Sequence, residues 1–202
     1  MATLAAWMLA GFVVLTLAVR VIIQLIRTGG TGLVGLRRGA GPLDWLSGIL
    51  FIGGMAMGIV SPILVLNDSL DPIDGLDVTA LHVLGILIAG TAGIAVFAAQ
   101  LGMGESWRVG VSDEERTDLV TGGWFSLVRN PIYAAMIAGW IGLALMVPTW
   151  LGIAAIAVVL IGLELQVRVV EEPYLIRTHG DAYRGYASRV GRFIPGVGRI
   201  PR

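Results

Sequence analysis

The chain has 202 residues, of which 56% are hydrophobic and only 14% are charged. An average soluble domain carries about 25% charged residues, so this composition indicates a protein embedded in a membrane. The 14 basic residues balance 14 acidic ones, which argues against a nucleic-acid partner. The absence of Cys excludes disulfides and thiolate metal sites, and with only two histidines we expect no metal centre.

Five apolar stretches are long enough, or nearly so, for a helix to cross a bilayer core of about 30 Å. They cover approximately residues 4–26, 43–66, 79–101, 131–147 and 150–170. Only Pro148 and Thr149 separate the last two stretches, which predicts a tight helical hairpin. Small residues in the second and third stretches favour close helix contact: Gly53, Gly54, Gly58, Gly85, Gly90 and Gly93. We therefore predict an all-α polytopic membrane protein with about five transmembrane helices, a C-terminal helical hairpin and a cytoplasmic C-terminal helical tail.

The charges of the short loops predict the orientation. The first connection carries or adjoins Arg27, Arg37 and Arg38, whereas the second, residues 67–78, contains four aspartates and no basic residue. The positive-inside rule then places the first connection in the cytoplasm, the N-terminus outside and the C-terminus in the cytoplasm. Residues 102–130 and the tail after 170 would share that face. A bacterial inner membrane is the simplest location.

The first polar motif is Arg129-Asn130-Pro131-Ile132-Tyr133. Asn at an N-cap, Pro in the first helical turn, and Arg and Tyr at a membrane interface are all common, which favours a purely structural role. The same residues also offer a partly positive helix N-terminus beside a guanidinium and a phenol, which suits a carboxylate ligand.

A second group of polar residues leaves the fifth stretch: Glu164, Arg168, Glu171 and Glu172. Their spacing of three or four residues predicts one shared helical face. An ionisable residue inside a membrane span indicates a functional site by default, with Arg168 the natural partner of Glu164. The alternative is an ion pair that reaches the membrane interface, followed by a solvated helix end.

The third group is the tail, residues 175–195. Tyr183 and Tyr186 are three residues apart and share a face if the tail is helical. The tail is either an amphipathic helix lying on anionic lipid or a lid that folds back over the first two groups.

These motifs follow one another in a recognisable order: Arg-Asn-Pro-x-Tyr, a hairpin, Glu-Glu-x-x-Leu, His-Gly-x-x-Tyr-x-x-Tyr and Arg-Val-x-Arg-Phe-Ile-Pro. Over about residues 100–196 the combination closely resembles the isoprenylcysteine carboxyl methyltransferase family. That family belongs to a wider group of integral membrane methyltransferases that includes phospholipid methyltransferases. Its members more often have His where this chain has Asn130, and often Phe where it has His179.

The resemblance implies S-adenosylmethionine as cofactor, with S-adenosylhomocysteine as product, bound between the hairpin and the folded-back tail. It implies that Glu171 and Glu172 hold the cofactor amine or ribose, that Tyr133 lines the sulfonium, and that Arg129 and Arg189 bind carboxylates. The predicted catalytic residues are Arg129, Glu172 and Arg189. The predicted cofactor-binding residues are Asn130, Pro131, Tyr133, Glu171, Glu172, His179, Tyr183 and Tyr186.

We expect residues 1–101 to form a three-helix scaffold and residues 102–202 the catalytic half of one integrated domain. The acceptor would be lipophilic and would enter from the bilayer; an isoprenylcysteine-type carboxylate is the leading prediction. Such a carboxylate is already ionised and needs an Arg but no base. An ethanolamine headgroup must first lose a proton, for which Glu171, Glu172 or Glu164 could act as base. Both residue types are present, so the acceptor stays undecided, as does the oligomeric state.

Two readings from other classes compete with this one. A membrane reductase resembling the sterol reductases would need NADPH. A non-enzymatic transporter or assembly partner would line a path through the bundle with polar groups, yet only Arg20, Gln24 and Glu164 are expected within the membrane.

Overall fold

The computed structural model describes residues 1–31, 33–35, 41–107, 109–110 and 118–201. The chain is mostly helical, as predicted, and the described part adds one short parallel strand pair, β1 (Leu33–Gly35) with β2 (Val109–Gly110). The long helices are α1 (Ala2–Val13), α2 (Arg20–Thr28), α3 (Pro42–Leu66), α4 (Thr79–Gly102), α5 (Pro131–Met146) and α6 (Trp150–Leu165). The shorter elements are α7 (Glu172–His179), α8 (Asp181–Ala187), the 3-10 turns η2 (Gly104–Ser106) and η3 (Gly123–Ser126), and the π-helical turns η1 (Val14–Val19) and η4 (Gln166–Glu171).

Four helical stretches of the described residues are long and apolar enough to cross a membrane: Ala2–Thr28, Pro42–Leu66, Thr79–Gly102 and Trp150–His179. At most 28% of the most apolar window of each is buried within the protein, so most of their side chains are left to face lipid. α5 has only 16 residues. At 1.5 Å per residue it rises about 24 Å, less than a bilayer core. Four of the five predicted spans are therefore supported, and the count of five is not.

The last span also differs from its predicted end near residue 170. Two π-helical turns, η1 and η4, join α1 to α2 and α6 to α7 without breaking the helix. Through η4 the last span continues to His179. The hairpin between α5 and α6 has its break at Pro148 and Thr149, as predicted.

The helices pack as two antiparallel pairs, α3 with α6 and α4 with α5. A Cβ added at Gly54 of α3 would lie 2.8 Å from the backbone N of Val159, and one at Gly85 of α4 would lie 2.6 Å from the carbonyl of Gly142. The close packing predicted for six glycines is confirmed for Gly54, Gly58 and Gly85. At the other three, an added Cβ would meet no atom of the described residues nearer than 3.6 Å.

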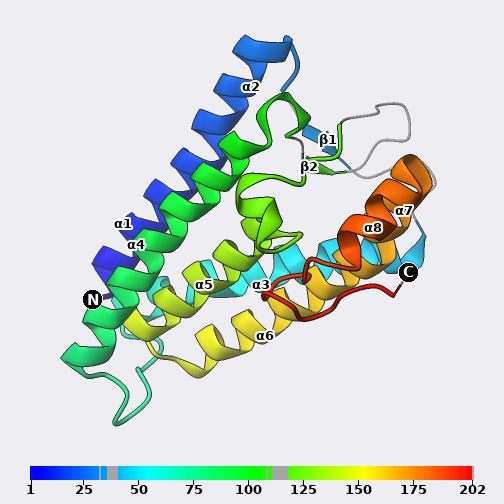
Figure 1. Ribbon diagram of the computed structural model, residues 1–202. Coiled ribbons are helices and arrows are strands. Elements are labelled where there is room, and N and C mark those ends of the chain that lie inside the picture. Colours follow the sequence, from blue (N-terminus) through cyan, green and yellow to red (C-terminus); the bar gives the residue numbers. More distant parts are fainter. Residues whose placement is uncertain (32, 36–40, 108, 111–117, 202) are drawn as a thin grey trace.

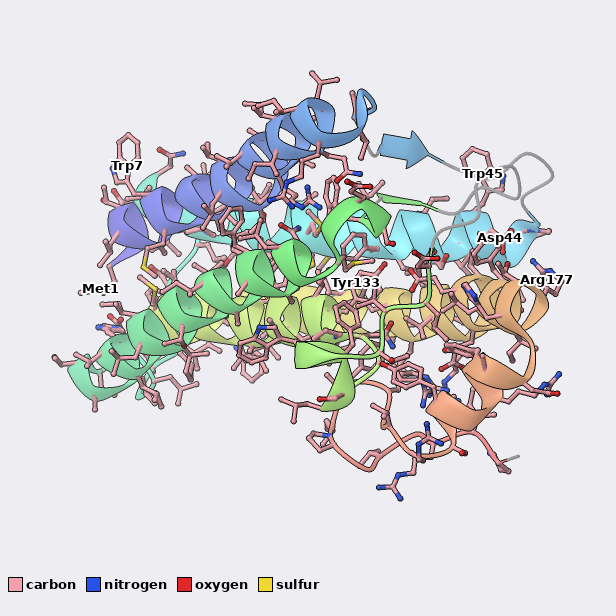
Figure 2. All side chains as sticks on the ribbon, turned by 45° about the horizontal axis from the view of Figure 1, so that its top comes forward. Met1, Trp7, Asp44, Trp45, Tyr133 and Arg177 are labelled. Carbon is pink, nitrogen blue, oxygen red and sulfur yellow. The ribbon has the colours of Figure 1, made fainter. Side chains whose placement is uncertain are left out.

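Figure 1 shows α1–α2 running beside α4, while α3 runs beside α6, and the two pairs diverge away from the N-terminus. The strand pair, α7 and α8 lie at the diverging end (Figure 1). Trp7 and Trp45, which are 73% and 53% exposed, lie toward opposite ends of the bundle (Figure 2). Exposed tryptophans near both ends of a helical bundle are typical of the two aromatic belts of membrane proteins, one at each membrane–water interface.

The packing places the two polar segments at one end of the bundle. Because α4 and α5 are antiparallel, the end of α4 lies beside the start of α5, and the main-chain N–H of Asn130 donates to the carbonyl of Arg192, 3.0 Å away. Residues 118–131 and the tail after 170 therefore meet, as the loop charges predicted. The side of the membrane on which they meet stays a prediction.

Candidate functional site

The tail folds back onto the start of α5. Val128 and Gly191 form a parallel β-bridge, and the main-chain N–H of Arg129 donates to the carbonyl of Gly191 at 2.8 Å. Asn130 occupies the N-cap position of α5, but its side chain makes no cap hydrogen bond. Its Nδ2 donates instead to the carbonyl of Arg192, 3.3 Å away. This geometry corresponds to the lid alternative for the tail, and the capping role expected for Asn130 is replaced by a contact with the tail.

Arg129 is buried and fixes the tail through four hydrogen bonds. Its Nη2 donates to Glu172 Oε1 at 2.5 Å and to the carbonyl of Gly198 at 3.0 Å. Its Nη1 donates to the carbonyls of Ala187 and Val190, at 3.1 and 2.6 Å. Two of these carbonyls come from the end of α8 and the turn after it, so the guanidinium satisfies groups that a helix end leaves unpaired. Arg129 is thus committed to holding the tail.

Glu172 is shared between two guanidinium groups. Besides Arg129, it accepts from Arg192 Nε at 2.8 Å and Arg192 Nη2 at 2.9 Å, in a bidentate pair. These hydrogen bonds raise the pKa of Arg192 above its ordinary value, so this guanidinium stays charged. Arg192 Nη1 also lies 3.5 Å from Glu164 Oε2, and Glu164 pairs with Arg168 at 2.5 Å on the exposed side. Both oxygens of Glu172 are therefore already used within the protein.

Glu171 has different surroundings from its neighbour. It accepts a 2.5 Å hydrogen bond from the hydroxyl of Tyr133, and both side chains are half-buried. Tyr133 packs against the hydrophobic cluster that contains Trp140 and Leu163; Figure 2 shows it in the interior of the bundle. A carboxylate beside an aromatic ring suits a ligand that carries an ammonium and a sulfonium group. S-adenosylmethionine carries both, so this pair fits the cofactor.

Tyr183 and Tyr186 share the buried face of α8, as predicted. Their rings pack edge to face with centroids 6.1 Å apart, and the Tyr186 hydroxyl donates to the carbonyl of Phe125 at 2.6 Å. Burial, with a smaller effect of the Glu172 charge, raises the pKa of Tyr183 to about 12. Burial also raises the pKa of Tyr186. Both phenols are therefore neutral at ordinary pH, and the hydroxyl of Tyr186 anchors α8 to η3.

The remaining predicted site residues lie around this cluster. Pro131 is the buried first residue of α5, and His179 is the half-buried last residue of α7. Arg189 is exposed just after α8. The described residues contain no group of three or more His, Asp or Glu side chains placed to hold a metal ion.

Sequence reasoning missed the part played by Arg192. Arg192 belongs to the Arg-Val-x-Arg-Phe-Ile-Pro motif, and its position in the sequence did not indicate which acidic residue it would pair with. The sequence held no signal for this pairing, because the burial of Glu172, which favours a second cation beside it, is known only from the structure.

Comparison with known families identifies the family of the chain. The model of the phospholipid methyltransferase family matches residues 80–182, just over half of the 202 residues. The match contains Arg129, Tyr133, Glu171 and Glu172 and ends before Arg192. No curated protein matches the chain. The chain therefore belongs to the phospholipid methyltransferase family and is a membrane methyltransferase.

Proposed function

We propose that the chain transfers a methyl group from S-adenosylmethionine to a lipophilic acceptor that reaches the site from the bilayer. The observation that carries the proposal is the Glu171–Tyr133 pair, which lies within the matched residues at the start of α5. S-adenosylmethionine supplies a methyl group bound to a positively charged sulfur. Residues 102–202 are the part of the chain to which we assign this chemistry, and residues 1–101 frame it.

Each side chain of the site has a separate role in the proposal. The carboxylate of Glu171 would hold the cofactor amine, and the hydroxyl of Tyr133 orients that carboxylate by donating to it. The ring of Tyr133 offers its face to the sulfonium. Arg189 is exposed and is the candidate for the cofactor carboxylate, because Arg129 is engaged by Glu172 and by tail carbonyls.

The Arg129–Glu172–Arg192 cluster contributes to the reaction by positioning the tail and not by contacting the reactants. It fixes the tail against the start of α5 and so brings α8 over the site. Methyl transfer needs aligned reactants and exclusion of water more than a covalent intermediate on the protein. We therefore treat Arg129, Glu172 and Arg192 as positioning residues.

A phospholipid amine is the acceptor that the family match favours. An ammonium group must lose a proton before it accepts a methyl group, and because Glu171 is assigned to the cofactor amine, we assign this proton to no side chain of the cluster. The second candidate is an isoprenylcysteine-type carboxylate, which the order of motifs from Arg129 to Pro195 favours. That acceptor needs a guanidinium and no base.

Calorimetry with S-adenosylhomocysteine on the purified protein tests the cofactor site. Glu171→Gln should weaken binding about tenfold or more, because a charged hydrogen bond to the amine is lost. Glu164→Gln is the matched control, seven residues earlier and half-exposed, and should bind like the wild type. Failure of the wild type to bind, or equal binding by Glu171→Gln, would overturn the site.

The acceptor is tested by giving the enzyme labelled S-adenosylmethionine and two substrates in parallel. Phosphatidylethanolamine in nanodiscs should become labelled at its amine if the first candidate is correct. N-acetyl-farnesylcysteine should form a base-labile methyl ester if the second is correct. Labelling of neither, with S-adenosylhomocysteine binding intact, would refute both acceptors and leave the cofactor site standing.

A further inference from the structure

The first half of the chain contains a buried guanidinium outside the family match, that of Arg20. This residue is 0% exposed and begins α2, directly after the π-helical turn η1. Its Nη2 donates to the carbonyl of Gly104 at 2.6 Å, and its guanidinium carbon lies 4.5 Å from the ring centroid of Trp107. Its Nε and Nη1 are buried and have no hydrogen-bond partner among the described residues. π-helical turns inside an α-helix are frequent at functional sites.

Within the described part of the chain, the contacts of Arg20 carry no negative charge. No carboxylate of the described residues forms an ion pair with it; its contacts there are one carbonyl and one aromatic face. A buried ion without a counter-ion costs several kcal/mol, so such groups persist where a ligand completes them. The unpaired Nε and Nη1 lie on different edges of the guanidinium, so each can donate to a separate oxygen of a lipid headgroup, and an anionic phosphate also supplies the missing counter-charge.

Two glutamines next to Arg20 are also incompletely paired. Gln24 Nε2 donates to the carbonyl of Glu105 at 2.9 Å, and Gln100 Nε2 donates to that of Thr16 at 3.0 Å. The Oε1 atom of each is buried without a partner within the described part of the chain. Hydrogen-bond acceptors beside the unpaired cation suit the hydroxyl or amine of a lipid headgroup.

An apolar groove continues along the same seam between the helices. A cavity of about 170 Å³ lies between α1, α4 and α5. Its lining is apolar and includes Phe12, Leu15, Gly90, Gly93, Ile94 and Met136. Ile94 is 69% exposed, so the groove borders the lipid-facing surface. Leu15 precedes Arg20 by five residues, about 7.5 Å along the helix axis, which puts the groove within reach of a lipid whose headgroup lies at Arg20.

We propose that α1, α2 and α4 bind a phospholipid, with its phosphate at Arg20 and one acyl chain in the groove. The bilayer supplies this ligand, and the charge of the phosphate complements the unpaired guanidinium. Arg20 itself lies outside the matched residues and forms no contact with the Glu171–Tyr133 pair, whereas the groove is shared with the matched helices α4 and α5. The first half of the chain would then recognise lipid as well as support the fold.

Native mass spectrometry of the purified full chain, titrated with phosphatidylglycerol, tests the headgroup contact. Arg20→Gln should weaken phosphatidylglycerol binding about tenfold or more, because both contacts from the guanidinium to the phosphate are lost. Arg27→Gln is the matched control, because Arg27 is an exposed arginine in the last turn of α2. It should leave the affinity for phosphatidylglycerol within about twofold of the wild-type value. Equal binding by Arg20→Gln and the wild type would overturn the proposal.

A second variant tests the groove without touching the charge. A Cβ added at Gly90 would have as its nearest neighbour the flexible Met8 side chain, at 4.0 Å, so Gly90→Leu should fill the groove without striking backbone. It should also weaken phosphatidylglycerol binding, and unchanged lipid binding would refute the placement of the acyl chain. Inorganic phosphate alone should bind far more weakly than the lipid, and equal binding of the two would show an anion site that needs no lipid.

Two further measurements separate this proposal from its alternatives. S-adenosylhomocysteine binding, measured on each variant, should stay at the wild-type level; loss of lipid binding alone then isolates the Arg20 site from the cofactor site. Asp113, Glu114 and Glu115 lie outside the described residues, and their joint replacement by amides tests a counter-ion from the chain itself. If that replacement lowers the melting temperature of the wild type in phospholipid-free detergent but not that of Arg20→Gln, the chain supplies the anion and the proposal fails.

Discussion

Arg129 and Arg20 are both buried arginines of one small membrane protein, yet their surroundings differ. Arg129 reaches a carboxylate and three carbonyls, and its neighbour Arg192 shares the same carboxylate. Arg20 reaches one carbonyl and a tryptophan ring among the described residues. A charge that is paired inside the protein holds segments together, whereas a charge left unpaired is available to a ligand. The second half of the chain thus uses its buried charges to dock the tail, and the first half leaves one open.

The largest effect is expected from removing the carboxylate shared in the second half. Glu172→Gln leaves Arg129 buried without a counter-ion and Arg192 with only the more distant Glu164, which should cost about 3–5 kcal/mol. We expect a much lower melting temperature and rapid proteolysis of the tail after α8. Glu164→Gln removes a half-exposed carboxylate from the same helix and should cost at most about 1 kcal/mol. Similar losses in the two variants would contradict the view that Glu172 fixes the tail.

Replacing Arg129 or Arg20 by methionine directly tests the contrast between these two buried arginines. Arg129→Met removes four hydrogen bonds and one partner of Glu172 and should destabilise the protein by about 2–4 kcal/mol. Arg20→Met removes a buried charge without stranding a carboxylate, so in phospholipid-free detergent it should be neutral or stabilising. Melting temperatures of the two variants provide the measurement. A loss at Arg20 as large as that at Arg129 would mean that Arg20 is already paired.

A substitution in the tail gives a smaller effect of the same origin. A Cβ at Gly191 would overlap the carbonyl of Ile194 and lie 2.7 Å from the backbone N of Gly196. Gly191→Ala should therefore loosen the tail and cost about 1–3 kcal/mol. At Gly185 of α8, an added Cβ would have its nearest neighbour at 4.0 Å, so Gly185→Ala should be neutral or slightly stabilising. Equal melting temperatures for the two variants would show that the tail is not tightly docked.

The smallest expected effect is alkaline loosening of α8 through Tyr183. Its pKa rises from 10.0 to about 12 on folding, so the folded state favours the neutral phenol. That contribution to stability is complete below about pH 10 and is lost as the pH rises toward about 12. The melting temperature of the wild type should fall over this range more steeply than that of Tyr183→Phe. Parallel curves would show that Tyr183 is not buried in the docked tail.

Hydropathy and loop charge were sufficient to predict much of the fold. Runs of apolar residues locate the spans, and Pro148 and Thr149 mark the break between the last two helices. Which helices pack against each other was harder to predict, because apolar helices have similar compositions. Only glycines such as Gly54 and Gly85, where another helix comes within contact of the backbone, distinguish the packed faces.

The candidate site was predicted in outline and differs in detail. Glu171 and Glu172 were predicted to share one face with Glu164 and Arg168, but adjacent residues of a helix point about 100° apart, and the two glutamates have different partners. The side chain of Asn130 was expected to cap α5, but it donates a hydrogen bond to the carbonyl of Arg192 instead. That contact joins residues 62 positions apart, so it depends on how the tail folds.

Transfer of a labelled methyl group from S-adenosylmethionine into extractable lipid is the most direct test of the central claim. Wild-type protein in nanodiscs of its native lipids should label lipid, Glu164→Gln should do so at a similar rate, and Glu171→Gln should be slower by about tenfold or more. Label transfer by Glu171→Gln at the wild-type rate, or no transfer by the wild type together with no binding of S-adenosylhomocysteine, would contradict a methyltransferase site at Glu171 and Tyr133.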